Sequence, residues 1–250
     1  LWTRHMGTPL VPNLFDVGRR SEAPANTDLI DWLASELVEN DWSMKHVHRL
    51  IVNSATYRMR SSAAGGETNV SRDPDNRHWW RRATIRIEAE VMRDSLLALA
   101  GELDTTMGGP SVPVDEQAAS KRRSLYFFHS NNERNPFLTT FDEADVKECY
   151  RRDQSIVPQQ ALALSNSRLV LDSAERIALR LGAGIPQDDD KAFVREAFRG
   201  VLCVSPVDAE LAACVKTLVA WRGLANTTSE QARTYLIWTL LNHNDFVTLR

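Results

Sequence analysis

The stretch WSMKHVHRLIVNS, residues 42–54, decides the fold class, because its apolar side chains recur at the spacing of one helix face. These apolar positions are Met44, Val47, Leu50 and Ile51. Ser43 lies just before them, where a hydroxyl oxygen caps the first backbone N–H groups of a helix. The stretch therefore predicts a helix that begins after Ser43 and buries one side.

Helical periodicity extends outward from this stretch over most of the chain. Residues 26–37 have the same pattern, and the short link to residue 43 predicts a helical hairpin. Further helices are predicted at residues 83–103, 158–181, 190–202, 206–222 and 229–241. Segments rich in Gly, Pro and polar residues separate them, at residues 1–25, 61–75 and 105–116.

Residues 124–128 (SLYFF) are the strand candidate, because they are short, aromatic-rich and bounded by charge. The predicted fold class is therefore all-α: an irregular, mainly helical multi-helix domain with at most a small two-stranded β element near residues 123–128. The 250 residues fit one or two domains. We interpret residues 1–250 as one helical domain, with a possible division into an N-terminal half, 1–120, and a C-terminal half, 121–250.

Composition excludes several classes of protein. The 30 Lys and Arg residues and 33 Asp and Glu residues give a formal net charge of −3. This balance lacks the basic excess of a nucleic-acid-binding protein, so no nucleic-acid partner is expected. No run of 18 apolar residues occurs, so no membrane-spanning segment is expected either. The chain begins Leu1-Trp2 rather than with Met, and we expect it to be part of a longer polypeptide of undetermined oligomeric state.

The sequence indicates no metal and no cofactor. Three cysteines, Cys149, Cys203 and Cys214, have no CxxC spacing, which argues against a disulfide framework and a thiolate metal site. A single disulfide between Cys203 and Cys214 stays an open alternative, because both lie in a predicted helical hairpin. His46 and His48 are two residues apart on a helix, so they face different sides and cannot bind one metal together.

Arginine strongly outnumbers lysine: the 30 basic residues comprise 25 Arg and 5 Lys. Coding bias in a GC-rich genome is one interpretation. The other is that many arginines form bidentate ion pairs or stack on aromatic rings, where a lysine ammonium is no substitute. The sequence alone leaves both open.

A polar loop after the strand candidate carries three candidate catalytic residues, His129, Glu133 and Arg134. A general base held near a guanidinium that binds developing negative charge is a catalytic arrangement. Asp142, from the acidic cluster at residues 141–148, and Arg152 complete the candidate set. The alternatives are an ordinary polar turn and an acid-rich helix N-terminus.

Two arginine pairs, Arg122-Arg123 and Arg151-Arg152, lie at predicted element boundaries in a segment that is also rich in carboxylates. An Arg–carboxylate network that locks the middle of the domain is the simpler interpretation. An anion-binding site formed by Arg122, Arg123 and Arg151 is the alternative.

Adjacent tryptophans, Trp79 and Trp80, cannot both face one core, so they are candidate interface residues. Other tryptophans lie on or next to helical stripes, and we assign them to core packing: Trp32, Trp42, Trp221 and Trp238.

The order of motifs along nearly the whole chain resembles the family known as domain of unknown function 1553. The matching motifs are Met6-Gly7-Thr8-Pro9, Trp42-Ser43-Met44-Lys45, His48 to Ser54, Thr56-Tyr57-Arg58, Asp73-Pro74-Asp75-Asn76, Arg86 to Asp94, Gly108-Gly109-Pro110-Ser111-Val112, Arg122-Arg123-Ser124-Leu125-Tyr126, Phe141-Asp142 and Pro158-Gln159-Gln160-Ala161-Leu162.

The resemblance implies a C-terminal domain of planctomycete surface and secreted proteins that follows a cytochrome c-like segment. It thus implies an extracytoplasmic location, periplasmic or at the cell surface, and upstream domains of the same polypeptide as partners. The family has no assigned activity, and this chain has no Cys-x-x-Cys-His motif with which to attach haem c. Two hypotheses follow: a helical module that docks on neighbouring domains, or a hydrolase-like enzyme acting on polysaccharide or another anionic polymer.

Overall fold

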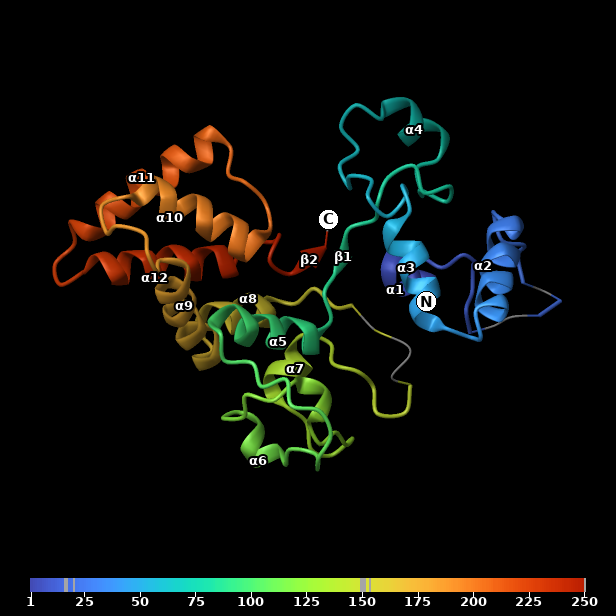
Figure 1. Cartoon of the computed structure of the whole chain (residues 1–250), viewed down its shortest axis with the longest axis horizontal. Coiled ribbons are helices and arrows are strands. Elements are labelled where there is room, and N and C mark those ends of the chain that lie inside the picture. The colour runs from blue at the N-terminus through green and yellow to red at the C-terminus, as the bar shows by residue number, and fades with distance from the viewer. Residues whose placement is uncertain (16–17, 20, 149–151, 153, 250) are drawn as a thin grey trace. The chain divides into compact units, whose positions relative to one another are not determined.

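The computed structural model describes residues 1–250 except 16–17, 20, 149–151, 153 and 250. The chain forms two compact units (Figure 1). Unit 1 consists of Leu1–Ile85 with the C-terminal residues from Thr248, and unit 2 consists of Arg86–Val247. One domain over residues 1–250, with a possible division near residue 120, stays a prediction.

Unit 1 has four helices, counted over its described residues, and a small core. The helices are α1 (Trp2–Met6), α2 (Thr27–Glu39), α3 (Met44–Asn53) and α4 (Glu67–Arg72). The core consists of Met6, Val47, Ile51 and Trp79. The helix predicted after Ser43 is confirmed: the Ser43 hydroxyl accepts the backbone N–H of His46, and Val47 and Ile51 are buried.

The two helical histidines of α3 face different neighbours, as their spacing predicts. His46 Nε2 lies 2.7 Å from Glu36 Oε2 on α2, whereas His48 Nδ1 lies 2.6 Å from His5 Nε2 on α1. Burial and the neighbouring His48 lower the pKa of His5. The second contact therefore joins α1 to α3 through an imidazole that resists protonation.

We expect acid to destabilise unit 1 through His5. The imidazole of an unfolded chain has a pKa of about 6.5. The pKa of folded His5 is lower, so between the two pKa values the folded state binds fewer protons than the unfolded state. Stability is thus fully present above the unfolded pKa and is lost as pH falls through the lower folded pKa. Thermal unfolding followed by near-UV circular dichroism at about pH 7.5 and 5.5 measures this loss of stability. His5→Gln is expected to reduce the pH dependence, and an unchanged dependence contradicts the assignment.

Unit 2 is a helical assembly in which α12 (Ser229–Leu241) packs against α9 (Arg168–Leu181) and α9 packs against α5 (Ala89–Ala100). Its other elements are α6 (Val114–Gln117), the 3₁₀ helix η1 (Ser124–Tyr126), α7 (Pro136–Thr140), α8 (Pro158–Asn166), α10 (Asp190–Ala197), η2 (Phe198–Leu202) and α11 (Asp208–Arg222). Large apolar side chains such as Phe193, Ile177 and Ile237 are fully buried in its core.

The mainly helical fold class is confirmed, and the described residues add only a two-stranded sheet, β1 (Ile85–Arg86) with β2 (Thr248–Leu249). The strand predicted at residues 124–128 is wrong: Ser124–Tyr126 form η1, and Phe127 makes only an isolated bridge to Val112. The helix predicted at residues 83–103 is shorter than predicted: α5 covers Ala89–Ala100, and Ile85–Arg86 before it form β1.

The helix predicted at residues 158–181 is in fact two helices, α8 and α9. Ser167 separates them, because its backbone is extended and its hydroxyl accepts the N–H of Val170. A serine that caps the following turn in this way ends the preceding helix. The helices predicted at residues 190–202 and 229–241 are confirmed, although the last turns of the first one are of the π type.

The arginine excess has a physical counterpart in the structure. Guanidinium groups lie 4.0–5.8 Å above aromatic rings at Arg81, Arg82, Arg86, Arg93, Arg122 and Arg233. Two more are bidentate, Arg222 on Asp190 and Arg152 on the Glu88–Glu90 pair. Planar stacking and forked hydrogen bonding both require a guanidinium, so at these positions Arg and Lys are not equivalent.

Candidate functional site

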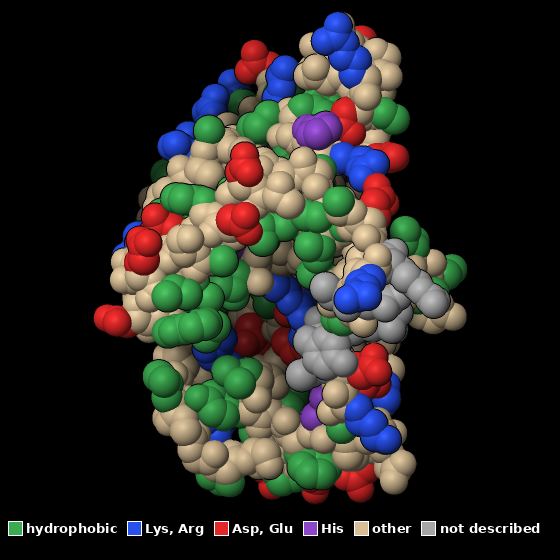
Figure 2. Space-filling model, turned by 90° about the vertical axis from the view of Figure 1, so that its right-hand side faces the viewer, with side chains coloured by type: hydrophobic (Ala, Val, Ile, Leu, Met, Phe, Trp, Pro, Cys, Tyr) green, Lys and Arg blue, Asp and Glu red, His purple; other side chains and the backbone are tan. Residues whose placement is uncertain are grey.

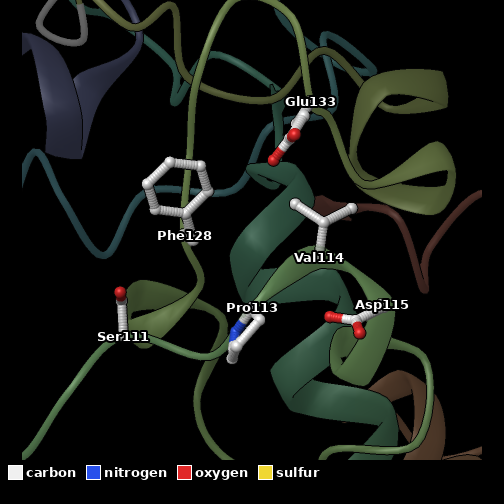
Figure 3. Close-up of a pocket in the computed structure, with 6 residues that line it drawn as sticks. All are labelled: Ser111, Pro113, Val114, Asp115, Phe128 and Glu133. Atoms are coloured by element: carbon white, nitrogen blue, oxygen red, sulfur yellow. The ribbon is translucent and has the colours of Figure 1, made fainter.

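A pocket of about 620 Å³ opens on unit 2 between two loop segments (Figure 3). One wall comes from the start of α6 and the residues before it, and the other comes from the loop after η1. The pocket is lined by Ser111, Pro113, Val114, Asp115, Phe128 and Glu133. Of these residues, only Glu133 was among the candidates chosen from the sequence.

A buried amide holds the two walls together. Gln117 on α6 is 1% exposed, and its Nε2 donates to the carbonyls of Val112, 3.2 Å away, and Phe128, 2.8 Å away. Its Oε1 accepts from Asn135 Nδ2 at 3.2 Å. The backbones of Val112 and Phe128 also bond directly, with 2.9 Å between N and O. The wall spacing is therefore fixed from inside the protein.

Arg122 fixes the loop that leads into the pocket. Its guanidinium stacks on Tyr126 at 4.1 Å and donates to the carbonyls of Thr106, Gly108 and Pro110. The Tyr126 hydroxyl accepts the N–H of Gly108, which has a φ of +79° that suits glycine. Two motifs far apart in the sequence, Gly108–Val112 and Arg122–Tyr126, thus form one structure.

Arg93 on α5 holds the segment from Ser120 to Ser124 by hydrogen bonds. It is 3% exposed and donates to the carbonyls of Ser120 and Arg122 and to the Ser124 hydroxyl. Burial lowers its pKa, although the neighbouring Asp94 opposes the shift. Asp94 in turn accepts the N–H and hydroxyl of Ser124.

A second, more compact polar cluster centres on Asp142. Its carboxylate accepts the N–H and hydroxyl of Ser155 at 2.8 and 2.7 Å, and lies 3.5 Å from both Arg86 and the side-chain amide of Gln160. Asp142 has a φ of +61°, a left-handed conformation that Asp tolerates better than most residues. The acidic segment is not a helix N-terminus, because no residue of 142–148 is helical.

Two of the four arginines of the predicted Arg–carboxylate network, Arg123 and Arg152, lie beside carboxylates. Arg152 pairs with Glu88 and Glu90 at the start of α5, at 3.3 and 3.0 Å. Arg123 lies 3.7 Å from Asp94. Arg151 lies outside the described residues. For Arg122 the structure shows carbonyl partners, and the anion-binding interpretation stays a prediction.

The remaining catalytic candidates, His129 and Arg134, lie beside a buried glutamate, Glu143. Glu143, with a side chain 5% exposed, accepts the Thr139 hydroxyl at 2.6 Å and lies 4.0 Å from both His129 Nε2 and Arg134. Among the described residues no contact joins all five candidates: Glu133 lines the open pocket, Asp142 and Arg152 line the compact cluster, and His129 and Arg134 lie beside Glu143.

Comparison with known families now bears on the whole chain. The model of the family described as PSD1, protein of unknown function (DUF1553), matches residues 1–218. The chain belongs to the DUF1553 family. The DUF1553 match includes every residue of the pocket and of the Asp142 cluster, and it ends within α11. Comparison with curated proteins found no match, and comparison with solved structures found none either.

The tryptophans of this DUF1553 chain lie only partly where the sequence placed them: Trp221 and Trp238 pack against the core of unit 2, as expected. Trp79 is 9% exposed in the core of unit 1, with its ring edge-on to Trp2 at 5.3 Å, and Trp80 is half-buried and donates to the Asp73 carbonyl. A docking role for Trp79 and Trp80 stays a prediction. The assignment of Trp42 and Trp32 to core packing is wrong, because Trp42 is 69% exposed and Trp32 is 48% exposed.

Trp42 lies in the turn between α2 and α3, and two more exposed apolar side chains lie on the adjoining ends of these helices. Val38 and Met44 are 54% and 61% exposed. Asp41 and Trp42 have φ values of +53° and +59°, which cost about 1 kcal/mol or more for a bulky residue. The backbone thus holds a large apolar ring outward at an energetic cost.

In the part of the chain that the structure describes, no group of three or more His, Cys, Asp or Glu side chains is arranged to hold a metal ion. Nor is any helix there long and apolar enough to cross a membrane. Cys203 and Cys214 are free thiols, and burial raises the pKa of Cys214. On the face shown in Figure 2, basic and acidic side chains are interspersed.

Proposed function

We propose that this chain is a module that docks on neighbouring domains of a larger extracytoplasmic protein, and that the α2–α3 turn is its contact surface. The observation that carries the proposal is the exposure of Trp42 in a turn with left-handed backbone, with Val38 on α2 and Met44 on α3 also exposed. Exposed apolar clusters of this kind mark interaction sites, and backbone strain persists where function requires it.

The occupant we propose is a domain of the same polypeptide. The DUF1553 resemblance implies such upstream domains, and it also implies the extracytoplasmic setting. Tryptophan is the residue type most often found at the energetic centre of protein interfaces. A hydrolase would require His129, Glu133, Arg134, Asp142 and Arg152 at one place, and no contact among the described residues joins all five, so nothing supports that hypothesis.

Photo-crosslinking in the complete encoded polypeptide tests the proposal. With p-benzoylphenylalanine at position 42, we expect crosslinks to residues outside this 250-residue chain. The matched control position is Val70, which is 42% exposed on α4 of the same unit and is expected to crosslink less. Crosslinks from position 42 only to a second copy, or equal yields at both positions, contradict the proposal.

The variant Trp42→Ser separates docking from folding. An exposed side chain contributes little to the stability of its own unit, so we expect a change in the free energy of unfolding within about 0.5 kcal/mol for the isolated chain. In the complete polypeptide the same variant is expected to release the docked neighbour, seen as increased protease access. A large loss of stability in the isolated chain would instead give Trp42 a structural role.

A further inference from the structure

We propose that the pocket between α6 and the loop after η1 binds a small organic cation, an ammonium or guanidinium group on an apolar stem. This binding is independent of the docking surface, because it uses a different unit of the chain. The volume of about 620 Å³ lies within the range of small-molecule sites.

The charge of the pocket indicates the sign of the ligand. Asp115 and Glu133 line it, and within the part of the chain that the structure describes neither carboxylate has an ion-pair or side-chain hydrogen-bond partner. Both carboxylates are exposed, whereas those of Asp94, Asp142 and Glu143 elsewhere in unit 2 are paired. Two free carboxylates in one cavity favour a ligand that carries positive charge.

The remaining lining residues indicate the body of the ligand. Phe128 is 44% exposed and presents its ring to the cavity, and Pro113 and Val114 provide apolar contact. In Figure 3 the Glu133 carboxylate points toward Phe128 and Val114. An aromatic face beside carboxylates suits a cation with a hydrocarbon stem, because the ring attracts the charge while the stem covers apolar surface.

The pocket is built in advance of any ligand. Gln117, 1% exposed, makes hydrogen bonds to both walls and to Asn135. Arg122 holds the loop before Ser111 by three carbonyls and a tyrosine ring. A fully bonded buried polar network of this kind fixes geometry, which lowers the entropic cost of binding. The network therefore fixes Val112, Phe128 and Asn135, the backbone positions that flank Asp115 and the loop that carries Glu133.

Titration of the chain with 1,5-diaminopentane, followed by NMR chemical shifts, tests the proposal. We expect saturable shifts centred on Ser111–Asp115 and Phe128–Glu133. The uncharged analogue 1,5-pentanediol is expected to produce none. Glu133→Gln and Asp115→Asn are each expected to weaken binding about fivefold, since each removes one partly exposed charge contact. Phe128→Leu is expected to weaken it by removing the ring.

The matched control is Glu116→Gln, which removes the same charge next to Asp115 but outside the lining. It is expected to leave binding unchanged. Equal weakening by Glu116→Gln and Glu133→Gln would show attraction to general negative charge and overturn the proposal, as would non-saturable shifts or equal binding of the diol. All substitutions are isosteric or conservative, and circular dichroism confirms that each variant is folded.

Discussion

Replacing Arg93 by alanine is expected to lower the free energy of unfolding by about 3–5 kcal/mol, because it removes one partner of a buried charged network. The Arg93 guanidinium satisfies two carbonyls and the Ser124 hydroxyl and covers the Phe127 ring at 4.4 Å. The alanine variant leaves these acceptors buried without a donor, beside the Asp94 carboxylate. Urea unfolding followed by far-UV circular dichroism measures the loss.

Lysine is expected to rescue Arg93 poorly. One ammonium cannot reach acceptors as far apart as those of Ser120, Arg122 and Ser124 and also stack on a ring. The matched control is Arg123→Ala: Arg123 lies 3.7 Å from the same Asp94, but its side chain is 49% exposed. We expect that control to cost at most about 1 kcal/mol. Equal losses for Arg93→Ala and Arg123→Ala would contradict the assigned network.

The sequence predicted those helices whose cap residue and buried apolar face both lie within a short local stretch. Ser43 as a cap, with Val47 and Ile51 on the buried face, is such a case, and so is the helix over residues 229–241. The strand at Ile85–Arg86 was missed because its partner, Thr248–Leu249, lies at the other end of the chain. Residues 124–128 have strand-like composition, but the partner that bridges Phe127 is a single residue, Val112.

The site was harder to predict than the fold, because its supporting residues act at a distance. Gln117 and Arg93 lie on helices of ordinary composition, and only folding places their side chains between segments. The sequence did single out arginine for stacking and forked pairing. In the structure Arg122 stacks on Tyr126, and Arg152 makes the forked pair. The partners of Arg152 lie on α5 rather than nearby in sequence, which spacing does not reveal.

Exposure was also predicted poorly for tryptophan, for a physical reason. Periodicity assigned Trp42 to a core because it adjoins a helical stripe. The turn between α2 and α3 instead takes left-handed backbone at Asp41 and Trp42, which turns the ring outward. Asp tolerates left-handed backbone, so its conformation at Asp41 is not unusual, but nothing in the sequence indicates that it continues at the bulky Trp42.

Replacing Asp142 by alanine is expected to cost about 2–4 kcal/mol, because one carboxylate satisfies several groups. The N–H and hydroxyl of Ser155 lose their acceptor, and Arg86 loses its ion-pair partner at 3.5 Å. The left-handed φ of +61° adds to the cost, since alanine has no side chain that stabilises it. Thermal and urea unfolding both measure the change.

Two further variants show which property of Asp142 matters. Asp142→Asn keeps an oxygen acceptor and a side chain that tolerates the left-handed backbone, but it removes the charge opposite Arg86, so we expect an intermediate loss. Asp145→Ala is the matched control: the Asp145 carboxylate accepts only backbone N–H groups, of Lys147 and Glu148, in an exposed turn. It is expected to cost about 1 kcal/mol or less. If Asp142→Ala costs no more than Asp145→Ala, the carboxylate is not the centre of the cluster, and the segment after α7 must be held by Arg152 and the glutamates of α5 instead.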